Sequence, residues 1–380
     1  MTAAAQPVVD ARRPTELHVG RGAVGRLGGL LDGHRARRVL VVATPRALHA
    51  VGVHTLLEDT QWLPFSAFTP NPRIEDVLTG CRLRENWQPD LVLGIGGGSA
   101  MDVAKAVRLL PADRDGALSA LRGEADPTAV LPPPLVLVPT TAGSGSEATA
   151  FATVYADGRK HSLDHASVRA TAAIVDPELT ESCPPVVTTS CAFDALSHAI
   201  ESFWSRRSTD ASREPALRAL ELLLPAVSED LRRPSADTRE LLSRGALLAG
   251  QAIDITRTTA AHAFAYELTI RHGVPHGVAC LLNLCWLFDH NLERADAPDD
   301  PRSPFPVLAR LLGTDLASGA EVFSGLLQRH GWSSRLRDYG VTETDLDGLV
   351  RAGIGAGARA RNNPVDLEPG TVREALARLL

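Results

Sequence analysis

Short apolar runs alternate with helical patterns through the first half of the chain. Four of these runs are rich in β-branched residues and end in Gly, Pro or Thr, and they cover residues 38–44, 91–99, 135–141 and 172–177. A run that is apolar at nearly every position is typical of a parallel strand buried on both faces. The pattern therefore predicts an α/β domain in residues 1–182, with a doubly wound, Rossmann-like parallel sheet covered by helices.

The pattern changes at about residue 182. Beyond it, apolar residues recur three and four positions apart, as they do on one face of a helix. This spacing is clearest in residues 216–232, 239–253, 279–291 and 371–380. We expect an all-helical domain in residues 183–380, with the boundary near the Pro-containing segment 181–185.

Charged residues are dispersed along the chain. The 380 residues carry a net charge of −6 without a long basic run, which argues against nucleic acid and against a membrane surface as partners. No segment stays apolar for the roughly 18 residues that a membrane-spanning helix needs, and the N-terminus lacks the apolar core of a signal peptide. We therefore expect a cytoplasmic protein with small-molecule partners, and a homodimer as its assembly.

A run of glycines links the strand expected near residue 91 to a following helix. Glycines let the backbone approach a pyrophosphate closely, and a helix N-terminus offers unpaired N–H groups to it. The spacing of these glycines is not GxGxxG, so an ordinary strand-to-helix turn is the alternative. The absence of the motif GxxxxGK[ST] argues against a nucleoside triphosphatase. The candidate cofactor-binding residues are Gly96, Gly97, Gly98, Ser99 and, on the helix, Asp102.

A second small, hydroxyl-rich loop follows the strand expected at 135–141. It contains Thr140 and Thr141, and alone it could be a flexible surface loop. Two such loops at the carboxyl ends of parallel strands face each other across the ligand crevice of an open sheet. The pair therefore favours a dinucleotide site.

The strand expected at 38–44 bears on the choice of cofactor. An acidic residue at its end would hydrogen-bond the ribose of NAD, but the chain continues as Thr44-Pro45-Arg46. An arginine can meet the 2′-phosphate of NADP, so NADPH is favoured over NADH. The alternative is that Arg46 only solvates a turn.

Carboxylate and imidazole groups are candidates for a metal site. Asp194 and His198 are four residues apart on a helical pattern and project from one face, although such a pair can also be a simple hydrogen-bonded one. His262 and His276 follow later, and the five cysteines show no CxxC spacing. One carboxylate with imidazoles suits Fe²⁺, Zn²⁺ or Mn²⁺.

Four segments together resemble the iron-dependent (group III) alcohol dehydrogenases. They are GGGSAMDVAKA, PTTAGSGSEAT, DALSHAIESFWS and HAFAYELTIRHGVPHG, in this order. The resemblance implies a divalent metal, most often Fe²⁺, held by Asp194, His198, His262 and His276. It also implies cofactor contacts from the glycine run, Thr140 and Thr141, and further contacts from Asn71 and Lys160.

The chain departs from the common family pattern at Tyr266. Many members carry a histidine there that is thought to relay a proton, and a tyrosine hydroxyl can still donate a hydrogen bond. The sequence of residues 201–212 and 252–269 is most similar to the subgroup that contains phosphonoacetaldehyde reductases. Arg257 is then the candidate cation for a phosphonate, or else a solvated residue at a helix start, while His272 is expected to be structural.

These observations predict a metal-assisted reductase that converts a short, anionic aldehyde to a primary alcohol with a nicotinamide cofactor. A general short-chain alcohol dehydrogenase of the same family is the first alternative. A sugar-phosphate cyclase of the same fold is the second. A non-catalytic nucleotide-binding protein that kept the fold is the alternative from another class, and the four metal-ligand candidates argue against it.

Overall fold

A computed structural model describes residues 14–127 and 131–380 of the chain. Two compact units make up the chain. One unit contains residues up to 141 and residues 145–182, and the other contains residues 142–144 and 183–380. The first unit is α/β and the second is all-helical, as the change of sequence pattern predicts.

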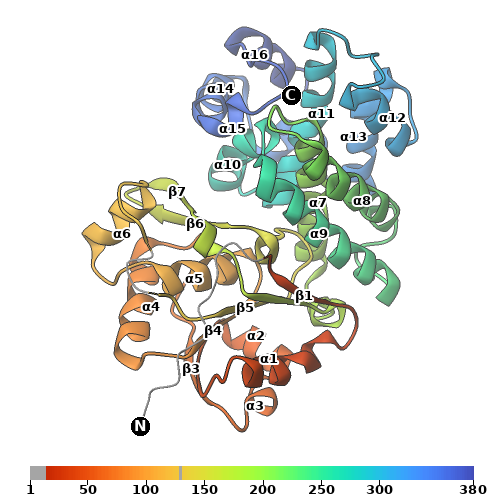
Figure 1. Cartoon of the computed structure of the whole chain (residues 1–380). Coiled ribbons are helices and arrows are strands. Elements are labelled where there is room, and N and C mark those ends of the chain that lie inside the picture. The colour runs from red at the N-terminus through yellow and green to blue at the C-terminus, as the bar shows by residue number, and fades with distance from the viewer. Residues whose placement is uncertain (1–13, 128–130) are drawn as a thin grey trace. The chain divides into compact units, whose positions relative to one another are not determined.

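The first unit is built on a parallel sheet of six strands (Figure 1). The spatial order is β1-β8-β5-β4-β2-β3, and every neighbouring pair is parallel. All four predicted strands are confirmed as β2, β4, β5 and β8. The strands are β1 (Glu16–Val19), β2 (Arg38–Ala43), β3 (Gln61–Phe65), β4 (Leu91–Gly96), β5 (Leu135–Pro139) and β8 (Ala172–Val175).

Helices cover both faces of this sheet, which explains why its central strands are apolar at nearly every position. Leu40 and Val42 of β2 pack on the face covered by α4, α5 and α6, whereas Val39 and Val41 pack on the face covered by α1, α2 and α3. The helices are α1 (Leu27–Gly33), α2 (Pro45–Val51), α3 (Val53–Leu56), α4 (Ile74–Trp87), α5 (Gly98–Leu109) and α6 (Arg114–Leu121).

The strand order reverses between β2 and β4. From β2 the chain moves outward to β3 on one side, and from β4 it moves through β5 to β8 on the other. Ligands of open α/β sheets bind at such a point, outside the carboxyl ends of the strands. The loop after β4 contains the glycine run, and the turn after β2 contains Arg46.

A two-stranded antiparallel hairpin supplements the sheet. It consists of β6 (Phe151–Ala156) and β7 (Arg159–Asp164), and its turn contains Asp157 and Gly158, both with positive φ. An Asp-Gly pair with positive φ at both positions is the preferred sequence of a tight hairpin turn.

The second unit is a bundle around a long central helix, α7 (Figure 1). Helices α8, α9 and α11 pack against α7. The predicted helical segments 239–253 and 279–291 fall in α9 and α11, whereas 216–232 and 371–380 extend past the ends of α8 and α16. The helices are α7 (Pro185–Trp204), α8 (Asp210–Val227), α9 (Ala236–Thr256), α10 (Ala260–His272), α11 (His276–Arg294), α12 (Pro304–Leu312), α13 (Gly319–Arg329), α14 (Leu346–Gly355), α15 (Ala358–Arg361) and α16 (Pro369–Ala377).

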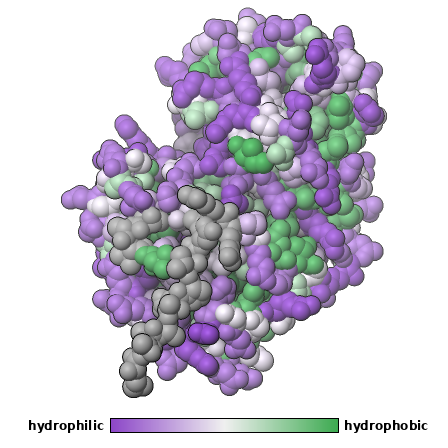
Figure 2. Space-filling model, in the orientation of Figure 1, coloured by the Kyte–Doolittle hydropathy of each residue, from purple (hydrophilic) through white to green (hydrophobic). Residues whose placement is uncertain are grey.

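The surface is mainly hydrophilic on the face drawn in Figure 2, where apolar residues form separate groups. All five cysteines are free thiols. Within residues 14–127 and 131–380, no helix has the length and apolar character to cross a bilayer.

Candidate functional site

Helix α7 carries the first two candidate metal ligands. Asp194 and His198 are one turn apart on the same face, and the side chains are nearly buried, with exposed fractions of 13% and 7%. The distance between Asp194 Oδ1 and His198 Nε2 is 3.7 Å. The predicted placement of this pair on one helix face is confirmed.

Helices α10 and α11 bring two more imidazoles to the same carboxylate oxygen. The distance from His262 Nε2 to Asp194 Oδ1 is 3.1 Å, and that from His276 Nε2 to the same oxygen is 3.8 Å. The rings of His198 and His262 stack at 4.5 Å between centroids. Three Nε2 atoms from three helices thus converge on one oxygen.

The turn between α10 and α11 sets the position of His276. Gly273 ends α10 with a φ of 67°, a left-handed conformation that glycine adopts without steric cost. Pro275 then precedes His276, the first residue of α11. This Gly and Pro therefore separate the helix of His262 from the helix of His276.

A close approach of two helices also positions this histidine. A Cβ at Gly277 would lie 1.8 Å from the carbonyl oxygen of Ser190 and 2.6 Å from the backbone nitrogen of Asp194. The N–H of Gly277 donates to Ser190 Oγ at 3.1 Å. Only glycine therefore allows α11 to begin directly against α7.

Burial and charge set the protonation of the cluster. Burial would raise the pKa of Asp194, but the neighbouring His198, His262 and His276 hold that pKa well below its usual range. Burial lowers the pKa of His198 to about 4, so this imidazole is neutral at pH 7. Burial also acts to lower the pKa of His262, but Cys280, Glu201 and Asp194 outweigh it and raise that pKa above 6.5.

The donor set fits a divalent transition metal. One carboxylate with three imidazoles is a ligand set for Fe²⁺, Zn²⁺ or Mn²⁺. His262 Nδ1 faces the carboxylate of Glu201, which leaves Nε2 for the cluster. His276 is 44% exposed, so the cluster can be reached from solvent within this unit.

Cys280 is a neighbour of the cluster that the sequence analysis missed. The ligand atoms of Asp194, His262, His276 and Cys280 all lie within 4.8 Å of one another. Its Sγ is 3.8 Å from His276 Nε2, and burial raises its pKa to about 11. Its position one turn after His276 on α11 was the available signal.

Glu201 is the second residue that the sequence analysis missed. It lies three residues after His198 and seven after Asp194, on the same face of α7, and its side chain is fully buried. Its carboxylate contacts His262 Nδ1. The spacing was visible in the sequence, but the partner on α10 was not.

The glycine run lies in the first unit, where β4 passes into α5. Gly97 is the N-cap of α5, and a Cβ on it would lie 3.2 Å from Thr141 Oγ1. Thr140 N donates to the carbonyl of Gly96 at 2.9 Å. The two predicted loops therefore lie side by side, with Gly97, Ser99 and both threonines partly exposed.

Asp102 is partly buried beneath the loop that follows β5. Its two carboxylate oxygens accept from Ser146 Oγ at 2.8 Å and from Thr153 N at 2.9 Å. Lys105 is fully buried and donates to Ser146 and to Thr149 Oγ1, the latter at 2.9 Å. These contacts fix the loop against α5, so any cofactor contact of Asp102 would add to this structural role.

Asn71 and Lys160 belong to neighbouring segments. Asn71 has a φ of 60°, and Tyr155 N donates to the carbonyl of Pro72 at 2.7 Å. Tyr155 in turn pairs with Lys160 across the hairpin. Arg46, in the first turn of α2, is exposed and donates to the carbonyl of Ser182.

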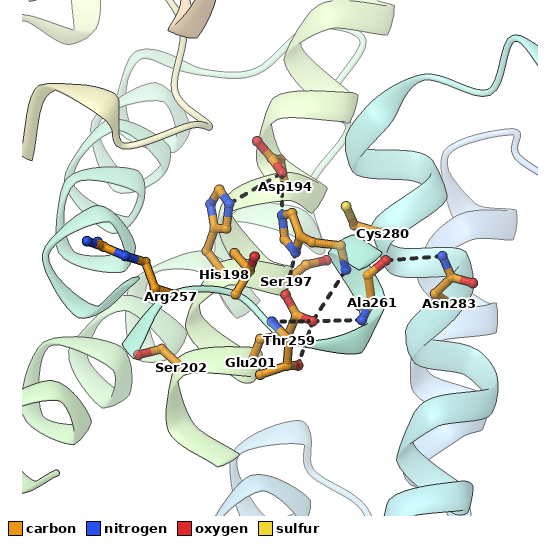
Figure 3. A network of polar contacts seen from close by, with 12 residues as sticks. Asp194, Ser197, His198, Glu201, Ser202, Arg257, Thr259, Ala261, Cys280 and Asn283 are labelled. Carbon is orange, nitrogen blue, oxygen red and sulfur yellow. Dashed lines mark hydrogen bonds and ion pairs between the residues drawn. The ribbon is translucent and has the colours of Figure 1, made fainter. Parts of the chain in front are cut away.

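Arg257 lies in the link between α9 and α10 rather than on the helix of His262. Its guanidinium donates to the carbonyl of Asp254 at 2.9 Å and is directed away from Asp194 (Figure 3). Tyr266 lies one turn after His262 on α10 and is partly buried. His272 is the last residue of α10, in keeping with a structural role.

Comparison with known proteins shows which family the chain belongs to. A family model described as iron-containing alcohol dehydrogenase matches residues 14–177, and one described as the C-terminal part of the Fe-containing alcohol dehydrogenase family matches residues 188–380. Phosphonoacetaldehyde reductase from Streptomyces viridochromogenes is 35% identical, covering 77% of this chain and 75% of its own. The 1-propanol dehydrogenase PduQ from Salmonella typhimurium is 32% identical, covering 73% and 72%.

A solved structure resembles nearly the whole chain. Sulfoacetaldehyde reductase from Bifidobacterium kashiwanohense, in complex with NAD⁺, superposes with a TM-score of 0.87 at 29% identity and covers 97% of this chain and 98% of its own. The two family models and these relatives lead to one conclusion. The chain belongs to the iron-containing alcohol dehydrogenase family and is an oxidoreductase of the alcohol–aldehyde pair.

Proposed function

We propose that this chain reduces phosphonoacetaldehyde to 2-hydroxyethylphosphonate with NADPH. The observation that supports this substrate is the 35% identity with phosphonoacetaldehyde reductase over 310 residues. The similar solved structure is a sulfoacetaldehyde reductase, which by its name also acts on a two-carbon aldehyde with an anionic group. A short anionic aldehyde is the substrate class that both names share.

A general short-chain alcohol dehydrogenase is the second candidate. The 32% identity with a 1-propanol dehydrogenase favours this candidate. The aldehyde that corresponds to 1-propanol is propanal, which carries no charge. A sugar-phosphate cyclase has less support, since the matching family models together extend from residue 14 to residue 380.

The four converging residues define the reacting centre of this proposal. A divalent ion held by Asp194, His198, His262 and His276 would supply Lewis-acid polarisation of the aldehyde oxygen. The nearly buried Asp194 carboxylate supplies the negative charge of the ligand set, and neutral His198 offers a lone pair. Tyr266, one turn after His262 on α10, would hold a hydrogen bond to the substrate or to water.

The loops after β4 and β5 are the proposed cofactor site. Backbone N–H groups at the start of α5 and the hydroxyl groups of Thr140 and Thr141 can bind the pyrophosphate. NADPH would supply the hydride. Arg46 is exposed in the first turn of α2, which contains no acidic residue, and it supports NADPH because its guanidinium can pair with the 2′-phosphate.

Arg257 is the proposed partner of the phosphonate. It is the cation in the link that leads into the helix of His262, and its side chain is 31% exposed. Rotation of its side chain away from Asp254 is required for this role, since its guanidinium is directed away from Asp194 here (Figure 3). A bidentate contact of arginine with a phosphonate resembles its contacts with phosphate.

A substrate panel tests the proposal. The iron-loaded chain is assayed with phosphonoacetaldehyde, sulfoacetaldehyde and propanal, each with NADPH and with NADH. We expect the highest kcat/KM with phosphonoacetaldehyde and NADPH. A kcat/KM for propanal equal to or above that for the anionic aldehydes would favour the second candidate, and a preference for NADH would remove the role of Arg46.

A further inference from the structure

Glu201 lies beside the candidate metal ligands but is not itself one of them. Its side chain is fully buried in the second unit. Its partners are donors from a short stretch at the start of α10, and each of its oxygens has a different set of them (Figure 3). A buried carboxylate is stable only when donors of this kind satisfy it.

One oxygen of Glu201 caps α10. Oε1 accepts from Thr259 Oγ1 at 2.7 Å, from Ala261 N at 2.7 Å and from Thr259 N at 3.2 Å. The first N–H groups of a helix have no partner within the helix, and Thr259, the N-cap, makes no side-chain cap of its own. Glu201 supplies that cap from α7, with its negative charge at the positive end of the helix.

The other oxygen of Glu201 faces His262. Oε2 contacts Nδ1 of the imidazole, while Nε2 of the same ring lies 3.1 Å from Asp194 Oδ1. A carboxylate at Nδ1 requires a proton on that nitrogen, and this leaves Nε2 as the nitrogen that can bind a metal.

We propose that Glu201 is a positioning residue that couples the start of α10 to the metal site. Through one side chain it fixes both the backbone from which His262 projects and the tautomer of the imidazole. The inference rests on the proposed metal ligands and adds a residue that acts through one of them.

Glutamine at this position separates the two contacts. Every partner of the carboxylate is a donor, so an amide must place its NH₂ group against one set of donors. The backbone and hydroxyl donors at Oε1 outnumber the single one at Oε2, so the amide oxygen turns to α10 and the NH₂ group turns to His262. The imidazole must then accept at Nδ1 and carry its proton on Nε2, which is the wrong tautomer for metal binding.

The test uses the full chain stripped of metal and titrated with Co²⁺, with its visible ligand-field bands as a second readout. Glu201→Gln should weaken Co²⁺ binding about 10- to 100-fold and change the bands, with little change in the melting temperature of the metal-free chain. Glu201→Asp keeps the charge but withdraws it from His262, so it should weaken binding as well.

Thr259→Val is the matched control. It removes a hydroxyl that donates to Oε1 but leaves the contact with His262. It should lower the melting temperature and leave Co²⁺ affinity and the bands unchanged. Glu201→Gln and Glu201→Asp proteins with the affinity and bands of the parent would overturn the inference, whereas a parent chain that takes up no Co²⁺ would overturn the proposed metal site itself.

Discussion

Arg257 has the most unusual backbone near the candidate site. Its φ of 64° and ψ of 177° lie in a region that residues with a Cβ rarely adopt. The link is held on both sides, because Asn362 Nδ2 donates to the carbonyl of Thr256 at 2.8 Å and to that of Thr258 at 3.1 Å. Such strain persists where the surroundings impose it, and it commonly marks functional positions.

Removing this strain should stabilise the protein. Glycine adopts the conformation of Arg257 freely, and relief of about 1–3 kcal/mol outweighs the roughly 0.5–1 kcal/mol that glycine's flexibility costs. We expect Arg257→Gly to raise the free energy of unfolding by about 1 kcal/mol in urea denaturation. Arg257→Ala removes the same side chain but keeps the strain, so a glycine variant no more stable than the alanine variant would contradict this reading.

Glu147 is a buried carboxyl that the proposed chemistry does not use. Burial raises its pKa from 4.5 to about 7, against the charge of Lys105. Between pH 4.5 and 7 the folded chain therefore holds a proton that the unfolded chain has lost, so this residue's contribution to stability decreases as the pH rises through that window. Above pH 7 the buried charge costs on the order of 3 kcal/mol.

Glu147→Gln should remove this dependence. The variant should be more stable than the parent above pH 7, with an advantage that shrinks as the pH falls and disappears by about pH 4.5. Urea unfolding across this pH range measures it, with Glu229→Gln, an exposed position, as the control for net charge. An advantage that grew toward low pH would have the wrong sign for this explanation.

At the scale of elements, the contact between α7 and α11 sets the geometry of the ligands. A Cβ at Gly277 would clash with backbone atoms of Ser190 and Asp194, and backbone atoms cannot rotate away. Gly277→Ala should therefore push α11 from α7, lower the free energy of unfolding by about 1–3 kcal/mol and displace His276. We expect metal affinity to fall together with stability.

Gly325→Ala provides the comparison for this helix glycine. Gly325 lies within α13, and a Cβ there would meet no atom within 4 Å. Alanine should stabilise that helix by up to about 1 kcal/mol and leave metal affinity unchanged. Equal metal affinity in the Gly277→Ala and Gly325→Ala proteins, measured by chelator competition, would show that the close contact does not position His276.

The sequence predicted the elements in which the apolar residues follow a clear pattern. The central strands were found because both faces are buried and nearly every residue is apolar. The strands β1 and β3 were missed because they lie at the edges of the sheet, β1 is half exposed, and β3 contains Pro64. The hairpin of β6 and β7 was missed although its Asp-Gly turn was a usable signal.

At the scale of the whole molecule, the site is a tertiary structure that no local pattern encodes. Spacing alone placed Asp194 and His198 together on one helix, and the sequence offered His262 and His276 as further candidates. Only resemblance to a family joined the four residues into one ligand set. Glu201 was missed because its partner His262 is 61 residues away in the sequence. Cys280 was missed although it lies one turn after His276 on the same helix. The convergence of three Nε2 atoms on Asp194 Oδ1 is what the structure adds.

The metal content of the purified chain tests the central claim most directly. We predict one divalent transition-metal ion per chain by elemental analysis, with loss of both the ion and aldehyde reduction in Asp194→Ala and His276→Ala, since each removes one of four ligands. An active parent chain without a stoichiometric ion, or variants that keep the ion and full activity, would contradict the account.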